Sequence, residues 1–223
     1  MAQNSQISLG ADVGIPFGDM SDDGASLILG PTLGFEVPVG RVAFTLQGGY
    51  SLVFVKEKGE TNRPVTKGWN MIPVQLGLKY FFSEPQMGWY VHGQGGIHSM
   101  IRNFNESTTT VITVNDNGTP DDTSDDTETS TEASIPSLDI TSTLFSYALG
   151  VGYQSEKVDV SLRYQGIGAD EEQTVFVQLP DGSTSQESVS YPTAAAYSYI
   201  GIRIAYLFNL GGGTRSAAPT GTP

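Results

Sequence analysis

Six charged residues lie in stretches of the chain where apolar residues otherwise occupy every second position. Three are acidic and three are basic, so their formal charges cancel. They are Asp12, Glu36, Lys79, Asp159, Arg163 and Arg203. A charged side chain taken out of water is costly unless an opposite charge pairs with it. This set therefore predicts a buried network of ion pairs, and an alternative use of the same groups is the lining of a selective pore.

A second set of candidate ligands lies in one polar stretch, residues 103–142. This stretch contains nine Asp or Glu residues and no Lys or Arg. Near its centre, oxygen ligands alternate around a glycine turn, a pattern that suits Ca²⁺. The candidate ligands are Asp116, Asn117, Asp121 and Asp122. The run lacks the closing bidentate Glu of the twelve-residue helix-loop-helix pattern, and the alternative is a solvated, mobile loop without metal. Apart from this possible Ca²⁺, we expect no cofactor.

The two histidines, His92 and His98, are the remaining candidates for catalysis. Ser99 follows His98 directly, which invites comparison with a nucleophile and its general base. Adjacent residues of a β-strand point to opposite faces, so these two side chains cannot readily form such a pair. We therefore expect that the protein is not an enzyme.

The elements that must position these residues are β-strands, and residues 143–168 give the clearest example. One face of this segment carries large apolar residues at every second position, and the other carries mostly Gly, Ser, Ala and Gln. Ser155, Glu156 and Lys157 interrupt the alternation, which then restarts, as in a hairpin. The small polar face suits a crowded polar interior, so the apolar face must be the outer one.

The same alternation recurs along the chain and predicts eight strands of about ten residues. Their ranges are 7–17, 27–37, 42–55, 72–82, 89–102, the two halves of 143–168, and 200–208. Short turns follow the second, fourth and sixth strands, and longer polar loops follow the others, including residues 103–142 and 170–194. This pattern predicts an all-β fold, an eight-stranded antiparallel up-and-down transmembrane β-barrel whose two termini lie on the short-turn side. Because the first strand would then pair with the last, we expect Asp12 to pair with Arg203, with Arg163 one strand further on.

Composition limits the alternatives. The chain has 223 residues, a formal charge of −13, 27 Gly and no Cys. No window of about 18 apolar residues exists, which excludes a transmembrane helix, and the acidic balance excludes a basic nucleic-acid surface. We expect residues 1–6 to be the remnant left after cleavage of a signal sequence, residues 7–210 to form the barrel, and residues 211–223 to form a disordered Gly, Thr and Pro tail.

Aromatic residues gather near the predicted strand ends, where the interfacial girdles of a membrane barrel belong. They are Trp69, Tyr80, Phe82, Trp89, Tyr153, Tyr206 and Phe208. The same aromatic residues would also suit the ordinary packing of a soluble sandwich. A soluble lipocalin-like carrier, with the two faces of each strand reversed, is a further alternative.

With these strands, the chain resembles the eight-stranded outer-membrane β-barrel proteins of Gram-negative bacteria, and the segments ISLGADVGIPFGD, LGPTLGFEVP and YIGIRIAYLF look most like the small barrels of Bacteroidetes. The resemblance implies an integral protein of the outer membrane, monomeric, in contact with membrane lipid and, at its external loops, with lipopolysaccharide. It also implies that Tyr206 and Phe208 form part of a last-strand signal for the barrel-assembly machinery. The implied role is structural or interactive at the cell surface. The alternatives are a passive channel for small solutes or hydrophobic molecules, opened by the lumen or by a gap near residues 89–102, and a lipid-modifying enzyme.

Overall fold

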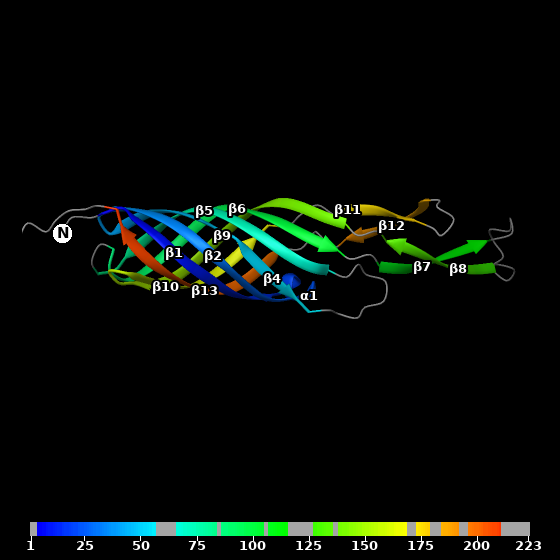
Figure 1. Cartoon of the computed structure of the whole chain (residues 1–223), viewed down its shortest axis with the longest axis horizontal. Coiled ribbons are helices and arrows are strands. Elements are labelled where there is room, and N and C mark those ends of the chain that lie inside the picture. The colour runs from blue at the N-terminus through cyan, green and yellow to red at the C-terminus, as the bar shows by residue number, and fades with distance from the viewer. Residues whose placement is uncertain are drawn as a thin grey trace, which may run out of the picture.

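The computed structural model describes residues 4–56, 66–83, 86–104, 107–115, 127–135, 138–168, 173–178, 184–191 and 196–210. Nine strands of this part of the chain form one antiparallel sheet that closes on itself (Figure 1). They are β1 (Gln6–Phe17), β2 (Ala25–Val39), β3 (Val42–Gly49), β4 (Ser51–Val55), β5 (Thr66–Phe81), β6 (Gly88–Phe104), β9 (Leu138–Gln154), β10 (Val158–Ile167) and β13 (Tyr197–Asn209).

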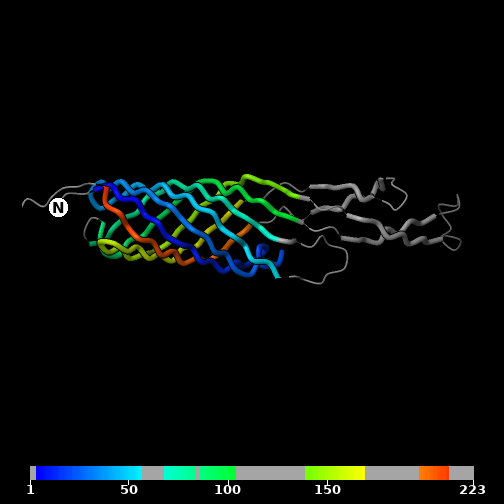
Figure 2. Tube along the Cα trace, in the orientation of Figure 1, coloured from blue at the N-terminus to red at the C-terminus, as the bar shows by residue number. Residues whose placement is uncertain are grey.

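Pairing between the first and last strands closes the barrel. β1 lies between β2 and β13, and its pairing with β13 runs from Gln6 opposite Asn209 to Phe17 opposite Ser198. The N–H of Leu210 donates to the carbonyl of Ser5, so the described ends of the chain lie together, as Figure 2 also shows. Since β3 and β4 are two parts of one barrel strand, the fold is the predicted closed eight-stranded antiparallel barrel.

The division between β3 and β4 has a chemical cause. Tyr50 lies between the two segments, and the register on either side of it is unchanged against both β2 and β5. Extending these registers places Tyr50 opposite Pro31 of β2 and Gly49 opposite Pro73 of β5. A proline has no N–H to donate, so the hydrogen-bond ladder is weakened on both sides of the same point. The Tyr50 N–H still donates to the Pro31 carbonyl at 3.1 Å.

The two faces of the strands differ as the alternation predicts. Large apolar side chains of every barrel strand are exposed on the outer surface, whereas the buried side chains include many polar and charged ones. Closure explains this arrangement, because the inward face of a narrow barrel is shielded from solvent by the wall itself. The glycine-rich strand β6 pairs with β9 along its whole length and with β5 as far as Phe81. The lateral gap considered near residues 89–102 is therefore absent from the described wall.

The two long stretches predicted as polar loops contain strands of their own. Residues 103–142 contain the ends of β6 and β9 and two further strands, β7 (Ser107–Asn115) and β8 (Thr127–Ile135). Residues 170–194 contain β11 (Gln173–Gln178) and β12 (Thr184–Tyr191), and these four strands form a second sheet in the order β12-β11-β8-β7. The many Thr and Val residues of β7 and β11 favour strands, a signal that the acidic residues of the same stretches obscured.

The only helix in the described part of the chain is α1 (Asp19–Asp22), which follows β1. Within the described residues, no helix combines the length and apolar character needed to cross a membrane.

Candidate functional site

The barrel interior contains all six charged residues of the predicted network, and Asp159 is the residue on which three of its contacts converge. The Lys79 ammonium lies 2.8 Å from Asp159 Oδ2, and the Arg203 guanidinium donates to the same oxygen at 3.1 Å. The Tyr90 hydroxyl donates to Asp159 Oδ1 at 2.6 Å. Lys79 also lies 2.9 Å from Glu36 Oε2. Two cations and two carboxylates thus share one buried cluster, which is called the ionic layer below.

Neutral polar side chains complete the ionic layer. Gln154 accepts a hydrogen bond from Lys79 at 2.9 Å and donates to Gln6 at 3.0 Å and to Glu36 at 3.4 Å. Arg203 donates to Ser8 at 2.7 Å and to Thr32 at 3.2 Å. One pocket beside this layer has a volume of about 20 Å³, which is the room needed by about one water molecule.

The remaining pair of charges is Asp12 with Arg163, and the expected pairing of Asp12 with Arg203 was wrong. Asp12 does lie opposite Arg203 in the register between β1 and β13, but its carboxylate pairs with the guanidinium of Arg163. Arg163 lies opposite Gly201 of β13, and Gly201 lies opposite Gly14 of β1. The Tyr199 ring covers Gly201; Arg163 extends across β13 to Asp12, and Arg203 extends to Asp159 instead.

The end of the barrel next to the long loops is apolar inside, which the sequence interpretation missed. The inward residues there form one buried cluster with Met20 of α1. Its largest members are Trp69, Met71, Met100, Tyr197, Tyr199, Ile28 and Met20. A signal was present, because runs such as Leu27-Ile28-Leu29, Leu52-Val53-Phe54 and Met71-Ile72 break the alternation at these strand ends. Trp69 therefore lies inside the barrel, only 2% exposed, and not in an aromatic girdle as expected.

The segment that carries α1 closes this end and is held by a polar clamp. The Tyr197 hydroxyl donates to Asp23 Oδ2 at 2.9 Å and accepts a hydrogen bond from Arg102 at 3.0 Å. The Arg102 guanidinium also lies 5.9 Å from the ring centroids of Trp69 and Tyr197. Glycines with positive φ, Gly18 at 60° and Gly24 at 94°, flank the helix. They give the sharp turns that direct the fully buried Met20 into the barrel.

Between the ionic layer and the apolar end, amide side chains cross the lumen. Gln75 donates to Gln165 at 3.2 Å and to Ser146 at 3.4 Å, joining β5 to β10 and β9. Both histidines are buried on the inner face. Ser99 belongs to the opposite phase of β6 and is half-buried. The interior is thus filled in three successive zones, which are ionic, amide and apolar.

Two further sets of predicted residues stand apart from this site. The candidate Ca²⁺ ligands Asp116, Asn117, Asp121 and Asp122 lie outside the described residues. The proposed assembly-signal residues Tyr206 and Phe208 face outward on β13, and their ring centroids are 4.9 Å apart.

No family model matches the chain, and no curated protein matches it either. Among solved structures, it is similar to the N-terminal β-barrel domain of OprF from Pseudomonas aeruginosa, with 12% identity and a TM-score of 0.45 over 93% of this chain and 100% of that one. It is also similar to Ail, the attachment invasion locus protein of Yersinia pestis, with 12% identity and a TM-score of 0.46 over 93% and 100%. A major outer membrane protein from Thermus thermophilus gives 14% identity and a TM-score of 0.45 over 92% and 99%. The fold of the present chain is assigned from its own strand pairing, and these neighbours are barrels of the same general kind.

Proposed function

We propose that this chain is an integral outer-membrane β-barrel protein with a closed lumen and a non-catalytic role at the cell surface. The observation that carries the proposal is the distribution of apolar and charged side chains between the outside and the inside of the barrel, which is the reverse of that in a soluble protein. Large apolar side chains of all the barrel strands are exposed, while Asp, Glu, Lys and Arg side chains are buried. A soluble protein rarely exposes a continuous apolar surface of this extent. A membrane barrel requires one, because its outer face meets hydrocarbon.

Aromatic side chains on the outer surface support the same proposal. Trp89 and Tyr153 stack edge to face with ring centroids 5.6 Å apart, near the short turns. At the other end of the barrel, the ring centroid of Tyr164 lies 5.8 Å from that of Phe17 and 6.0 Å from that of Tyr147. Two separated aromatic bands are typical of barrels whose ends lie at the two interfaces of a bilayer.

The filled interior supports a role other than conduction. Ion pairs, amide hydrogen bonds and the apolar cluster occupy successive levels of the lumen. Small membrane barrels of eight strands are just wide enough for side chains to fill. A hydrated ion passing through would have to break buried ion pairs, which is strongly unfavourable.

We place the role at the external loops. Residues 103–142 and 170–194 join barrel strands at the end that carries α1, and the first of these stretches is acidic without a single basic residue. Lipopolysaccharide, as the outer-leaflet lipid, is the first partner to test, together with Ca²⁺. In this proposal membrane lipid is the constant partner, and the barrel works as a monomer.

The test is conductance across a planar bilayer after refolding, combined with electrophoretic mobility of heated and unheated samples. A folded barrel migrates differently before and after heating, and a closed lumen gives no stable conductance. Discrete conductance steps that change in Arg163→Met or Arg203→Met would overturn the closed lumen. A protein that stays monodisperse without detergent and shows no heat-dependent band would overturn the membrane assignment itself.

A second candidate, a conduit for small apolar molecules, is favoured by one observation. The interior next to α1 is lined with Trp, Met and Tyr side chains, and Met20 fills it. The ionic layer beneath opposes passage along the axis. Binding of a fluorescent naphthylamine probe to Met20→Ala, but not to the native protein, would support an apolar site under α1 without any conductance.

A further inference from the structure

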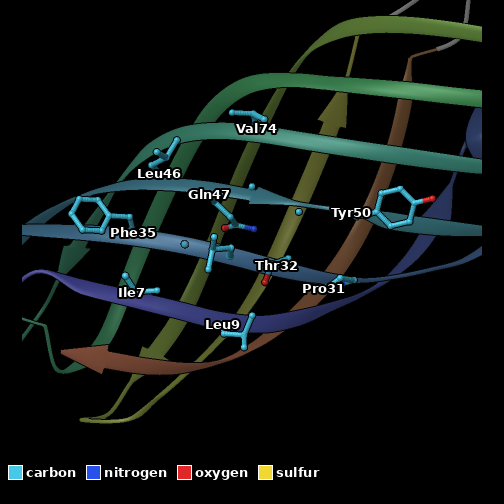
Figure 3. A pocket seen from close by; sticks show the side chains of 13 residues that line it. Ile7, Leu9, Pro31, Thr32, Phe35, Leu46, Gln47, Tyr50 and Val74 are labelled. Atoms are coloured by element: carbon cyan, nitrogen blue, oxygen red, sulfur yellow. The ribbon is translucent and has the colours of Figure 1, made fainter. Parts of the chain in front are cut away.

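A groove of about 670 Å³ crosses the outer surface of the barrel over β1, β2, β3 and β5. Figure 3 shows Phe35 at one end and Tyr50 at the other, with Leu9 and Val74 on opposite sides. No Asp, Glu, Lys, Arg or His contributes to its lining. The groove belongs to the exposed apolar surface and is separate from the interior described above.

The groove exists because one outward side chain is missing. Along β3 and into the residue that follows it, Leu46, Gly48 and Tyr50 occupy successive outward positions, so Gly48 leaves a gap between two large residues. A Cβ at Gly48 would find only the Pro73 carbonyl oxygen within 4 Å, at 3.7 Å. The neighbours of Gly48 in the register are Leu33 on β2 and Val74 on β5, and their side chains form the two banks of the gap. The floor is therefore backbone, next to the point where Pro31 and Pro73 interrupt the ladder.

The lining restricts the chemistry of an occupant. Ligand pockets in proteins are typically about 300–1,000 Å³ and use a few polar groups to fix orientation. This groove falls in that range of size, but it offers no charged group. Its lining residues Thr32 and Gln47 are buried on the inner face, and the Tyr50 hydroxyl is the polar side-chain group at its end. It would take a hydrocarbon segment and would not recognise a headgroup.

A second copy of the barrel fits less well. A stable protein interface uses about 20–30 residues on each side, and the groove supplies 13, so a second copy would also have to displace lipid from the surrounding surface. The groove is continuous with the exposed apolar surface around it, which includes Leu9, Leu33 and Leu46. In a bilayer that surface is already covered by acyl chains.

We propose that the groove is a binding site for one acyl chain of a membrane lipid, held against the Gly48 backbone between Leu33 and Val74. The inference rests on the proposed function, because it requires the outer surface to face a bilayer. It goes further because it assigns one place on that surface where a lipid acyl chain stays bound, whereas lipids elsewhere on the surface exchange freely. An acyl chain in the groove makes dispersion contacts on three sides, whereas a chain on the flat outer surface makes them on one side, so the groove binds the chain more tightly.

The experiment is native mass spectrometry of the barrel after refolding into vesicles of phosphatidylethanolamine and phosphatidylglycerol and release into mild detergent. Gly48→Phe fills the groove. Its Cβ would lie 3.7 Å from the Pro73 carbonyl oxygen, which is an ordinary van der Waals distance, so the backbone need not move. The matched control is Gly95→Phe, because Gly95 lies at an outward position of β6, outside the groove, with no atom within 4 Å of a Cβ. Heat-dependent mobility is recorded for each protein to show that it is folded.

We expect one retained lipid per native barrel and per Gly95→Phe barrel, and a loss of about tenfold in the retained fraction for Gly48→Phe. A single-chain lysolipid should be retained as well as a two-chain lipid. Equal retention in all three folded proteins would overturn the acyl-chain site and leave the membrane barrel intact. Cross-linking of a Leu33→Cys variant into dimers within vesicles would also overturn it, in favour of a second copy. Failure of the native chain to fold in any lipid would instead refute the proposed function.

Discussion

Replacing Asp159 by Asn should cost more stability than replacing Glu36 by Gln, because Asp159 pairs with two cations and Glu36 with one. Asp159 holds Lys79 at 2.8 Å, Arg203 at 3.1 Å and the Tyr90 hydroxyl at 2.6 Å. An Asn side chain has nearly the same shape, but its carbonyl oxygen carries no charge to neutralise the two cations, and its NH2 group replaces an acceptor with a donor. The six charges of the predicted network would then sum to +1 instead of zero.

The magnitude depends on the partners that each cation retains. Lys79 keeps Glu36 at 2.9 Å, whereas Arg203 keeps only neutral acceptors among the contacts described above, Ser8 and Thr32. Removing one partner of a buried ion pair typically costs about 3–5 kcal/mol, so we expect a loss in this range for Asp159→Asn. Glu36→Gln should cost less, about 1–3 kcal/mol, because Asp159 still neutralises Lys79.

The assay is urea unfolding of the refolded barrel in detergent micelles, followed by tryptophan fluorescence and by heat-dependent mobility. Asp139→Asn is the control, since it removes the same charge from an exposed residue and should change the free energy of unfolding by less than about 0.5 kcal/mol. The double variant Asp159→Asn with Arg203→Met restores neutrality with two carboxylates, Asp12 and Glu36, against Lys79 and Arg163. It should recover part of the loss. A single-variant loss below about 1 kcal/mol, or a double variant less stable than the sum of its two single changes, would refute the reasoning.

Two further predictions concern α1 and the barrel wall. Tyr197→Phe removes the hydroxyl that joins Arg102 to Asp23 and should raise hydrogen exchange of residues 18–24 by about tenfold or more, corresponding to about 1–3 kcal/mol. Unchanged exchange there would show that the apolar cluster alone holds α1. Gly30→Ala should destabilise the barrel by about 1–3 kcal/mol, because its Cβ would lie 2.7 Å from the Ser51 Cα. Gly95→Ala has open space and should be close to neutral in the same urea titration, and equal effects of the two substitutions would contradict the account of the wall.

The barrel itself could be predicted because its signal is repeated. Every barrel strand has the same period of two, and a slip by one residue would turn a whole apolar face into the lumen. The positions of Asp12, Asp159 and Arg203 on the inner face follow from that period alone. The closure of β1 on β13 follows from the even number of strands.

The partners of the interior ion pairs could not be predicted from the alternation of the sequence. The register places Asp12 opposite Arg203, yet the carboxylate pairs with Arg163, which lies one strand further on in β10. A long side chain can reach several partners from one register position, and the side chains packed around it decide which one it meets. The alternation of the sequence predicts which face of the sheet a side chain occupies, but it does not predict how far that side chain extends or which partner it contacts.

The apolar end was missed because the interior was treated as uniform. Trp69 and Met71 are apolar at inward positions, and Met20 comes from a segment read as a polar loop. What makes these residues suitable for the interior is the combination of closure with the fold-back of α1. Neither property is local to the strands that carry them.

The central claim is that the outer face meets lipid while the lumen stays closed to it, and the two tryptophans of the chain test it directly. Trp89 is 62% exposed on the outer face, and Trp69 is 2% exposed in the interior. Single-tryptophan variants, Trp69→Phe and Trp89→Phe, would be refolded into vesicles whose acyl chains carry bromine near the headgroup. Strong quenching of Trp89 together with weak quenching of Trp69 is the result that this account predicts. Quenching of Trp69 without quenching of Trp89, or of neither residue, would contradict it.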